Sequence, residues 1–201
     1  MKKKLTVKDI LESKGKKKLT QVYVHTPLEA NACEQSGIDM IVSSENNNFK
    51  FLRESAMNTF FTVGLQFGRY LSEYEIVKRS FQLLETGADA IYCPQSSRFI
   101  KAISNEGIPV VGHAGFIPYK ATHYGGFKAF GKNLNEAKKI LKQIHTLQEA
   151  GAFATEIEIV PEEIIEILYK KTDIFLIGMG SGTICDAQYL FSEDILGYNN
   201  G

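Results

Sequence analysis

Several features are scarce in this 201-residue sequence, and each absence excludes a class of protein. Cysteine occurs three times, at Cys33, Cys93 and Cys185, and no two cysteines form a CxxC pair. This spacing indicates neither a zinc knuckle nor a disulfide framework. No apolar run is long enough to span a bilayer, and no apolar core of a secretory signal follows the N-terminal lysines. We therefore expect a protein of the reducing cytoplasm that has no membrane partner.

A net charge is also absent, because 23 Lys and Arg residues balance 23 Asp and Glu residues. This balance gives no electrostatic basis for nucleic acid as the main partner. Lysines gather near the start, at 2–4, 14 and 16–18, and we interpret them as the solvated surface of a first helix and loop. No linker or low-complexity segment divides the chain, so residues 1–201 are predicted to form one domain.

Short β-branched or aromatic runs alternate with longer amphipathic stretches along the whole chain. The runs predict seven strands and a short eighth strand. They lie at Leu19–Val24, Asp39–Ser43, Phe60–Val63, Ala90–Cys93, Pro109–Gly112, Thr155–Val160, Ile174–Gly178 and Ile195–Leu196. Apolar residues at helical spacing, or a proline suited to a first helical turn, predict helices between them. These helices lie at Leu28–Ser36, Glu73–Glu85, Asn135–Ala150 and Glu162–Lys171.

A glycine stands between a predicted helix and the next strand at three junctions, Gly37, Gly87 and Gly151. Glycine at this place supplies a left-handed helix cap. Repeated helix–glycine–strand units indicate parallel strands joined by crossover helices. Seven or eight such units favour an α/β fold of the closed (β/α)8 TIM-barrel type over an open doubly wound sheet, although the sequence does not exclude the open sheet.

Functional side chains of such a barrel stand where strands end and the next loops begin. Glu158 is the most informative of them, because alternation along 155–160 places Glu156 and Glu158 together on one face of a strand. A carboxylate directed into the barrel has a raised pKa, which suits a general base acting next to a carbonyl group. Pairing of both glutamates with lysines near the barrel mouth is an equally good interpretation.

Three further features follow predicted strands. His113 could hydrogen-bond a substrate oxygen, bind a metal or have a structural role only. Gly178–Gly182 is predicted to precede a helix whose N–H groups could bind an anion, although the fingerprint of a dinucleotide site is incomplete. The glycine-containing stretch from His113 to Lys128 is interpreted as a lid over the barrel mouth or as a subunit contact.

Several ordered segments resemble the ketopantoate hydroxymethyltransferase family, which belongs with the phosphoenolpyruvate mutase and isocitrate lyase enzymes. The resemblance is clearest over the second half of the chain. The segments that carry it are Ile108–Pro118, Tyr124–Lys128 with Gly131 and Lys132, Glu158–Pro161, Ile177–Gly182, Asp186 with Gln188, and Asp194–Gly197.

The resemblance implies a (β/α)8 barrel and an aldol-type reaction of pantothenate biosynthesis. In that reaction Mg²⁺ holds 2-oxoisovalerate (3-methyl-2-oxobutanoate), a base removes the proton next to the ketone, and the enolate takes a one-carbon unit from methylenetetrahydrofolate. Glu158 matches the base of the family, and His113 matches a histidine of its substrate site. We expect the other substrate-binding residues to be Ser44, Asn46, Tyr92 and Ser181.

The chain departs from the family at the positions that the resemblance assigns to the metal. Glu45 is the candidate metal ligand, because Ser44–Asn46 matches the first metal-binding segment. The second metal position falls on Gly64, which has no ligand atom in a side chain. Tyr92 and Pro94 replace a substrate lysine and an acidic residue. Because Mg²⁺ prefers hard oxygen ligands, these replacements argue against a complete Mg²⁺ site.

Three hypotheses remain open from the sequence. The first is an enzyme, either a hydroxymethyltransferase or a related lyase or transferase acting on a 2-oxo acid, with Glu158 as the base. The second is a non-catalytic homologue that binds a ligand or takes part in an assembly. The third is different chemistry at Tyr92 or Cys93, although Cys93 is better interpreted as a buried apolar residue. A barrel that lacked its last helix would leave apolar surface open, so we also expect a homo-oligomer.

Overall fold

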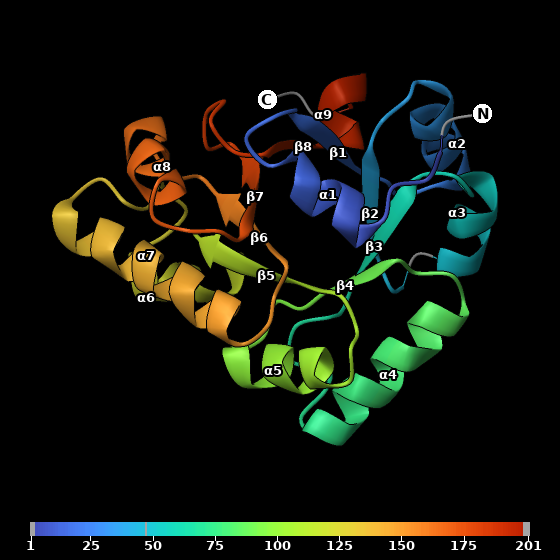
Figure 1. Ribbon diagram of the computed structural model, residues 1–201, viewed down its shortest axis with the longest axis horizontal. Helices are drawn as coiled ribbons and strands as arrows, with labels where there is room; N and C mark the ends of the chain where they lie inside the picture. The colour runs from blue at the N-terminus through green and yellow to red at the C-terminus, as the bar shows by residue number, and fades with distance from the viewer. Residues whose placement is uncertain (1–2, 47, 199–201) are drawn as a thin grey trace.

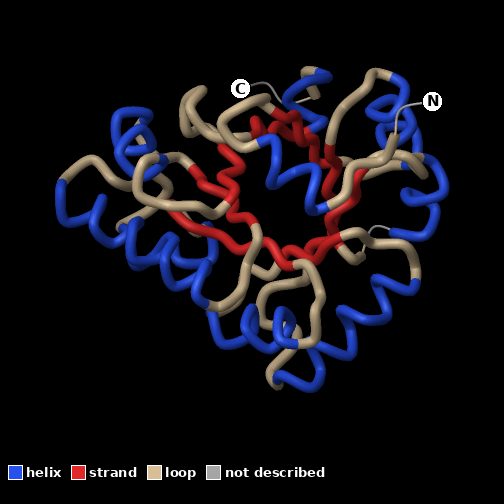
Figure 2. The backbone as a smooth tube through the Cα atoms, viewed as in Figure 1, coloured by secondary structure: helices blue, strands red, loops and turns tan. Residues whose placement is uncertain are grey.

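Eight parallel strands close into a barrel in chain order in the computed structural model, which describes residues 3–46 and 48–198. Figure 2 shows the strands as an inner ring with most of the helices outside it. The strands are β1 (Leu19–Tyr23), β2 (Met40–Ser44), β3 (Phe60–Gly64), β4 (Ala90–Tyr92), β5 (Val110–Gly115), β6 (Ala154–Glu158), β7 (Phe175–Met179) and β8 (Ala187–Phe191). Pairing of β1 with β8 closes the ring, which confirms the predicted α/β barrel over the open sheet.

Helices follow most of the strands and form the outer layer (Figure 1). They are α1 (Val7–Ser13), α2 (Pro27–Gln35), α3 (Phe49–Ser55), α4 (Glu73–Glu85), α5 (Ser97–Asn105), α6 (Ala121–Tyr124), α7 (Leu134–Glu149), α8 (Glu162–Tyr169) and α9 (Ser192–Leu196), with a 3-10 turn at Pro118–Lys120. The four helices predicted from the sequence correspond to α2, α4, α7 and α8. No helix in the described part of the chain is long and apolar enough to cross a membrane.

Two apolar clusters hold these layers together. One lies between the strands and the helices and contains residues such as Ile41, Phe61 and Ile144. The other fills the barrel interior and includes Phe60 and Phe175. Ile10 of α1 belongs to the interior cluster and is fully buried, so α1 closes one end of the barrel. Figure 1 shows α1 lying across the ring of strands.

The eighth strand is not where the sequence predicted it. Ile195 and Leu196 lie in the short helix α9 and are about half exposed, at 53% and 52%. The strand is instead Ala187–Phe191, where Ala187 and Tyr189 face the barrel interior and Leu190 is exposed. The prediction was wrong because this strand has little of the β-branched pattern used to find the others, and only its pairing with β1 and β7 defines it.

The glycine-rich segment after β7 also differs from the prediction. In the described residues 180–186 there is no helix, and the chain passes directly from β7 into β8. The proposed anion site at a helix start therefore has no helix to support it. The sequence predicted a barrel that could lack its last helix. In the structure the short helix α9 follows β8, and the connection without a helix is instead the one between β7 and β8.

Candidate active site at the mouth of the barrel

A cavity of about 330 Å³ opens at the carboxyl end of the strands. Glu156 and Glu158 from β6, His113 from β5 and Tyr92 from β4 line it on one side. Aromatic side chains, among them Tyr23, Tyr119, Tyr189 and Phe191, form much of the remaining wall. Because active sites of such barrels lie at this end of the strands, the cavity is the candidate active site.

The two glutamates lie on the inner face of β6, as the alternation predicted. Glu156 is 4% exposed and Glu158 is 7% exposed, whereas Ile157 between them packs into the outer cluster. No lysine or arginine of the described residues forms an ion pair with either glutamate, so the interpretation as surface pairs with lysines was wrong. Burial, opposed by His113 and reinforced by the charge of Glu158, raises the pKa of Glu156 to about 7.

His113 connects the two carboxylates to Tyr92. Its Nε2 atom lies 3.1 Å from Oε2 of Glu158 and 2.9 Å from the carbonyl oxygen of Phe116, so this nitrogen carries a hydrogen. Its Nδ1 atom lies 2.7 Å from the Tyr92 hydroxyl and 3.8 Å from Oε2 of Glu156. Burial lowers the pKa of His113, but the hydrogen bond to Glu158 and the charges of both glutamates outweigh burial, and the net shift is upward. The site thus favours an imidazolium between two acids.

The protonation state of His113 determines what Tyr92 can donate. A neutral ring with hydrogen on Nε2 accepts the Tyr92 hydroxyl at Nδ1, whereas an imidazolium donates from Nδ1 to the phenol oxygen. In the second case the hydroxyl hydrogen is free to bond a ligand. Tyr92 itself stays protonated, because burial and the charge of Glu156 raise its pKa well above 10.

The backbone around Glu158 is unusually constrained. Ile159 has φ of 48°, which is rare for a β-branched residue and strained. Gly115 on β5 has φ of +84°, and a Cβ atom there would lie 2.6 Å from the carbonyl oxygen of Glu158. Both residues let β5 and β6 end closely side by side, which holds the Glu158 side chain at the cavity next to His113.

Of the other predicted substrate-binding residues, Ser44 lies at the cavity, whereas Asn46 and Ser181 do not line it. Asn46 is exposed and accepts a hydrogen bond from Arg69, so it does not line the cavity. The Ser181 hydroxyl is buried, donates to the carbonyl oxygen of Ile157 at 2.9 Å and accepts from the backbone of Val160 at 3.0 Å. Ser181 therefore joins the ends of β6 and β7, is 1% exposed and does not line the cavity.

Glu45 turns away from the cavity. Its carboxylate accepts hydrogen bonds from the Tyr70 hydroxyl at 2.6 Å and from the backbone of Gln66 at 3.0 Å. It also forms an ion pair with Arg79, with 2.7 Å between Nε and Oε2. These partners use both carboxylate oxygens, because the residue is longer than the aspartate that the resemblance implies.

The residues present do not fit the Mg²⁺ site that the resemblance implies. Glu45 is held by Arg79, Gly64 has no side chain, and Pro94 has no oxygen donor on its ring. Within the described residues no group of three or more His, Cys, Asp and Glu side chains is arranged to hold a metal ion. The chemistry of the site is therefore considered through the side chains that are present.

Sequence reasoning missed the extent of this network. It singled out Glu158 and did not assign a separate role to Glu156, whose pKa is raised to about 7. It also missed Gln21, which donates to Oε1 of Glu156 at 3.4 Å from the far side of the barrel. The inward place of Gln21 in the strand Leu19–Tyr23 was the available signal, since a polar residue among buried neighbours needs a partner.

Comparisons with known proteins assign the family. The sequence profile of ketopantoate hydroxymethyltransferase matches residues 46–201, more than half of the chain. This chain belongs to the ketopantoate hydroxymethyltransferase family. The 3-methyl-2-oxobutanoate hydroxymethyltransferase of Kosmotoga olearia is 31% identical over 97% of this chain and 82% of its own length. The enzyme of that name from Pyrococcus furiosus is 30% identical over 96% of this chain and 77% of its own length.

Solved structures support the fold. The crystal structure of 2,3-dimethylmalate lyase, a member of the phosphoenolpyruvate mutase and isocitrate lyase superfamily, has a TM-score of 0.69 at 12% identity. The superposition covers 96% of this chain and 84% of the lyase. The structure of phosphonopyruvate hydrolase has a TM-score of 0.63 at 15% identity. That superposition covers 87% of this chain and 72% of the hydrolase. At these identities the similarity shows the barrel alone.

Proposed function

We propose that this protein is a hydroxymethyltransferase that adds a one-carbon unit to the carbon next to the ketone of a 2-oxo acid. The names of its relatives indicate 3-methyl-2-oxobutanoate as the substrate. The observation that carries the proposal is the position of Glu158, a buried carboxylate in the barrel-mouth cavity whose one ion-pair partner among the described residues is His113. A carboxylate in such surroundings is suited to remove a weakly acidic proton from carbon.

The first step is enolisation. Glu158 takes the proton from C3 of the 2-oxo acid, the electron pair of the C–H bond forms the C2–C3 double bond, and the carbonyl electrons move onto the C2 oxygen. The Tyr92 hydroxyl, whose hydrogen is free when the His113 imidazolium donates to its oxygen, supplies a hydrogen bond to the C2 oxygen, and the charge of the imidazolium stabilises the enolate. Glu156 in its protonated form adds a further donor without adding negative charge.

The second step forms the carbon–carbon bond. The family resemblance indicates methylenetetrahydrofolate as the source of the one-carbon unit, and addition of water to its methylene carbon breaks both C–N bonds and releases formaldehyde and tetrahydrofolate. C3 attacks the carbon of formaldehyde, the C2 carbonyl re-forms, and the electrons of the attacked C=O bond move onto its oxygen, which takes the proton that Glu158 removed from C3.

Proton exchange tests the first step without any one-carbon donor. The protein is incubated with 3-methyl-2-oxobutanoate in heavy water, with and without Mg²⁺, and loss of the C3 proton signal is followed by NMR. We expect exchange in both conditions, and we expect Glu158→Gln to slow it by about a hundredfold or more. Glu163→Gln, at an exposed position of α8, is the matched control and should exchange at the unaltered rate.

The replaced acidic positions favour a second candidate, a binding homologue without turnover. It would bind the 2-oxo acid at the same cavity and would show no exchange from a well-folded sample. Exchange that depends on Glu158 would eliminate this candidate, and its absence with and without Mg²⁺ would eliminate the transferase. A cytoplasmic location and a homo-oligomeric state stay predictions from the sequence.

A further inference from the structure

The charges in the barrel-mouth cavity are poorly matched to an anionic ligand. Of the described residues that line this cavity, none is a lysine or an arginine. The charged groups of the lining are Glu156, Glu158 and His113. With both acids ionised and the imidazole protonated, one negative charge remains uncompensated. The carboxylate of a 2-oxo acid would add a second, and burying an unpaired charge is costly.

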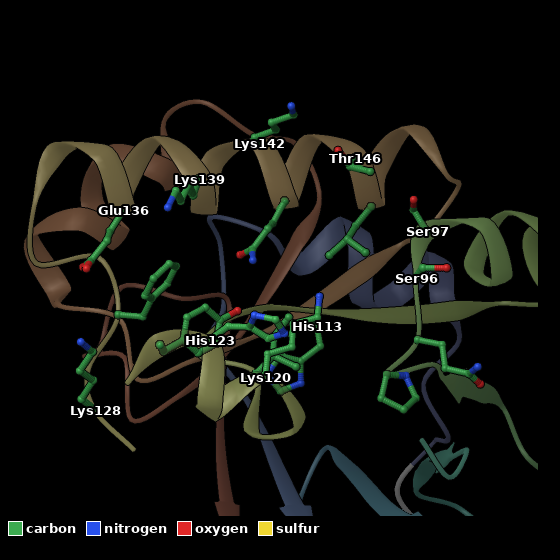
Figure 3. Close-up of a pocket in the computed structure, with 17 residues that line it drawn as sticks. Ser96, Ser97, His113, Lys120, His123, Lys128, Glu136, Lys139, Lys142 and Thr146 are labelled. Atoms are coloured by element: carbon green, nitrogen blue, oxygen red, sulfur yellow. The ribbon is translucent and has the colours of Figure 1, made fainter. Parts of the chain in front are cut away.

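Lysines do occur close by, but they line a different cavity. A neighbouring cavity of about 720 Å³ shares His113 with the barrel-mouth cavity and is lined by Lys120, Lys128, Lys139 and Lys142. Figure 3 shows His113 below α7, the helix that carries Lys139 and Lys142. None of these four lysines lines the barrel-mouth cavity, so a ligand inside it has no direct contact with them.

Much of the remaining wall is aromatic and gives a carboxylate little stabilisation. Tyr23, Tyr189 and Phe191 form one group, with ring centroids 5.5 Å apart between Tyr23 and Phe191 and 5.3 Å apart between Tyr189 and Phe191. The faces of aromatic rings carry the negative part of the ring quadrupole. This wall therefore suits the apolar substituent of a ligand, and its negative charge has to be accommodated at the acids and the imidazole.

The two acids differ in how well their charge is supported. Glu158 has the closer contact with the imidazole, at 3.1 Å from Nε2 of His113. Glu156 lies 3.8 Å from Nδ1 of His113, and its other oxygen accepts from the neutral amide of Gln21 at 3.4 Å. Burial raises the pKa of Glu156 to about 7, despite the opposing charge of His113. Glu156 is therefore the acid that gains a proton at the lower cost.

No other group around Glu156 supplies a positive charge in the described part of the chain. Burial and the charge of Glu156 raise the pKa values of Tyr92 and Tyr189 well above 10, so both remain neutral phenols. The polar and titratable groups of the surrounding strands are Gln21 and Tyr23 of β1, Tyr92 of β4, His113 of β5, Glu158 of β6 and Tyr189 of β8.

We propose that a carboxylate ligand enters the barrel-mouth cavity together with one proton from solvent, and that Glu156 binds this proton and donates the resulting O–H group to the ligand. Glu156 then determines specificity, because a single acid can offset the charge of a singly charged ligand only. Glu158, which is paired with His113, keeps its role as the base. Identification of the ligand as a 2-oxo acid rests on the proposed function.

Calorimetric titration counts the protons that accompany the ligand. The protein is titrated with 3-methyl-2-oxobutanoate in buffers of different ionisation enthalpy, and the carboxyl group of the ligand is ionised at every pH used. We expect uptake of about one proton per bound ligand at pH 8 and close to none at pH 5.5, where Glu156 is already protonated. Affinity should fall about tenfold from pH 8 to pH 9. An infrared band of a protonated carboxyl group should appear on binding at pH 8.

Glu156→Gln separates the acid from the imidazole as the group that takes up the proton. The glutamine mimics the protonated acid, so the variant should bind without proton uptake, should lack the infrared band and should bind about tenfold more tightly than the unaltered protein at pH 8. Glu163→Gln, at an exposed position of α8, is the control and should retain the uptake. A ligand with a second carboxylate, 2-oxopentanedioate, should bind about tenfold more weakly than 3-methyl-2-oxobutanoate at pH 5.5.

Each contrary result would overturn the proposal. Absence of binding or of proton uptake at pH 8 would do so, as would uptake that persists in Glu156→Gln or is lost only in Glu158→Gln. Uptake that disappears when Mg²⁺ is added would show that a metal supplies the charge. Equal affinity for 2-oxopentanedioate would refute the role in specificity.

The proposed function and this inference can fail separately. Proton uptake at Glu156 in a protein that does not exchange the C3 proton would retain the inference and refute the enolisation. Exchange that depends on Glu158, with binding that takes up no proton, would retain the enolisation and refute the inference.

Discussion

The acids at the two ends of the barrel have opposite kinds of partners. At the closed end, Asp39, Asp89 and Asp186 each precede a strand and accept a backbone N–H from the strand before it, at 2.9–3.0 Å. Each also pairs with a lysine, at distances of 3.1, 2.6 and 2.9 Å. At the open end, Glu156 and Glu158 have no such partner among the described residues and share His113.

The difference separates structural acids from reactive ones. A carboxylate whose lone pairs are used by backbone N–H groups and ammonium groups holds strands in register. Two neighbouring buried carboxylates that share one imidazole repel each other when both are charged, and a bound ligand can reduce this repulsion. This contrast supports the proposal that Glu156 and Glu158, and not the three aspartates, take part in the chemistry.

The largest effect should come from the closed end. Asp89→Ala leaves Arg53 buried without its partner at 3.0 Å and removes the acceptor for the backbone of Phe61. We expect a loss of about 3 kcal/mol in the free energy of unfolding, measured by urea denaturation. Proton exchange per folded molecule should be unchanged. Unaltered stability would show that the two ends do not differ in the way described.

His113→Gln tests the open end. The change removes the cation between Glu156 and Glu158 and the hydrogen-bond partner of Tyr92. We expect C3 proton exchange to fall by about a hundredfold, with stability altered by less than in Asp89→Ala. A stability loss as large as that of Asp89→Ala, with exchange retained, would make His113 a structural residue.

Two glycines with positive φ allow a matched comparison between the ends. At Gly115, by the open end, a Cβ atom would lie 2.6 Å from the Glu158 carbonyl oxygen, whereas at Gly37, by the closed end, it would meet nothing within 4 Å. Alanine at Gly37 should cost about 1 kcal/mol from the backbone conformation alone. Alanine at Gly115 should cost about 2 kcal/mol and should also slow exchange. Equal unfolding free energies of the two variants would argue against the close approach of β5 and β6.

The smallest effect is a dependence of stability on pH that involves Glu156. Its pKa is raised to about 7 in the folded protein from 4.5, so its stabilising contribution is complete below pH 4.5 and is lost as pH rises through about 7. Glu156→Gln should therefore be more stable than the unaltered protein at pH 8, by roughly 1–2 kcal/mol, and should differ less at pH 5. Denaturation curves at both pH values measure this, and an equal difference at the two pH values would contradict the shift.

The sequence predicted the barrel well because periodicity and helix–glycine–strand junctions are local signals. Gly37, Gly87 and Gly151 all have positive φ after their helices, as the cap argument requires. The errors fell where local pattern is weak. Strand β8 is defined by pairing with β1, and the segment after Gly180 has no helix because the chain enters β8 at once.

The candidate site was predicted in part for the same reason. Alternation was enough to place Glu156 and Glu158 on one face, and the position of His113 after an apolar run brought it to the correct end of the barrel. The partners of Glu45 could not be predicted, because Tyr70 and Arg79 lie 25 and 34 residues away in the chain.

By itself the sequence determined the repeating strand–helix plan, the family resemblance and the residues that stand at strand ends, because each of these depends on neighbours within a few positions. Only the tertiary structure decided which acids are neutralised and which are not. That outcome depends on distances between residues far apart in the chain: Lys4 reaches Asp89, whereas no lysine reaches Glu156 in the part of the chain that the structure describes. The same packing raises the pKa of Glu156 at the candidate active site, because burial penalises its charged form.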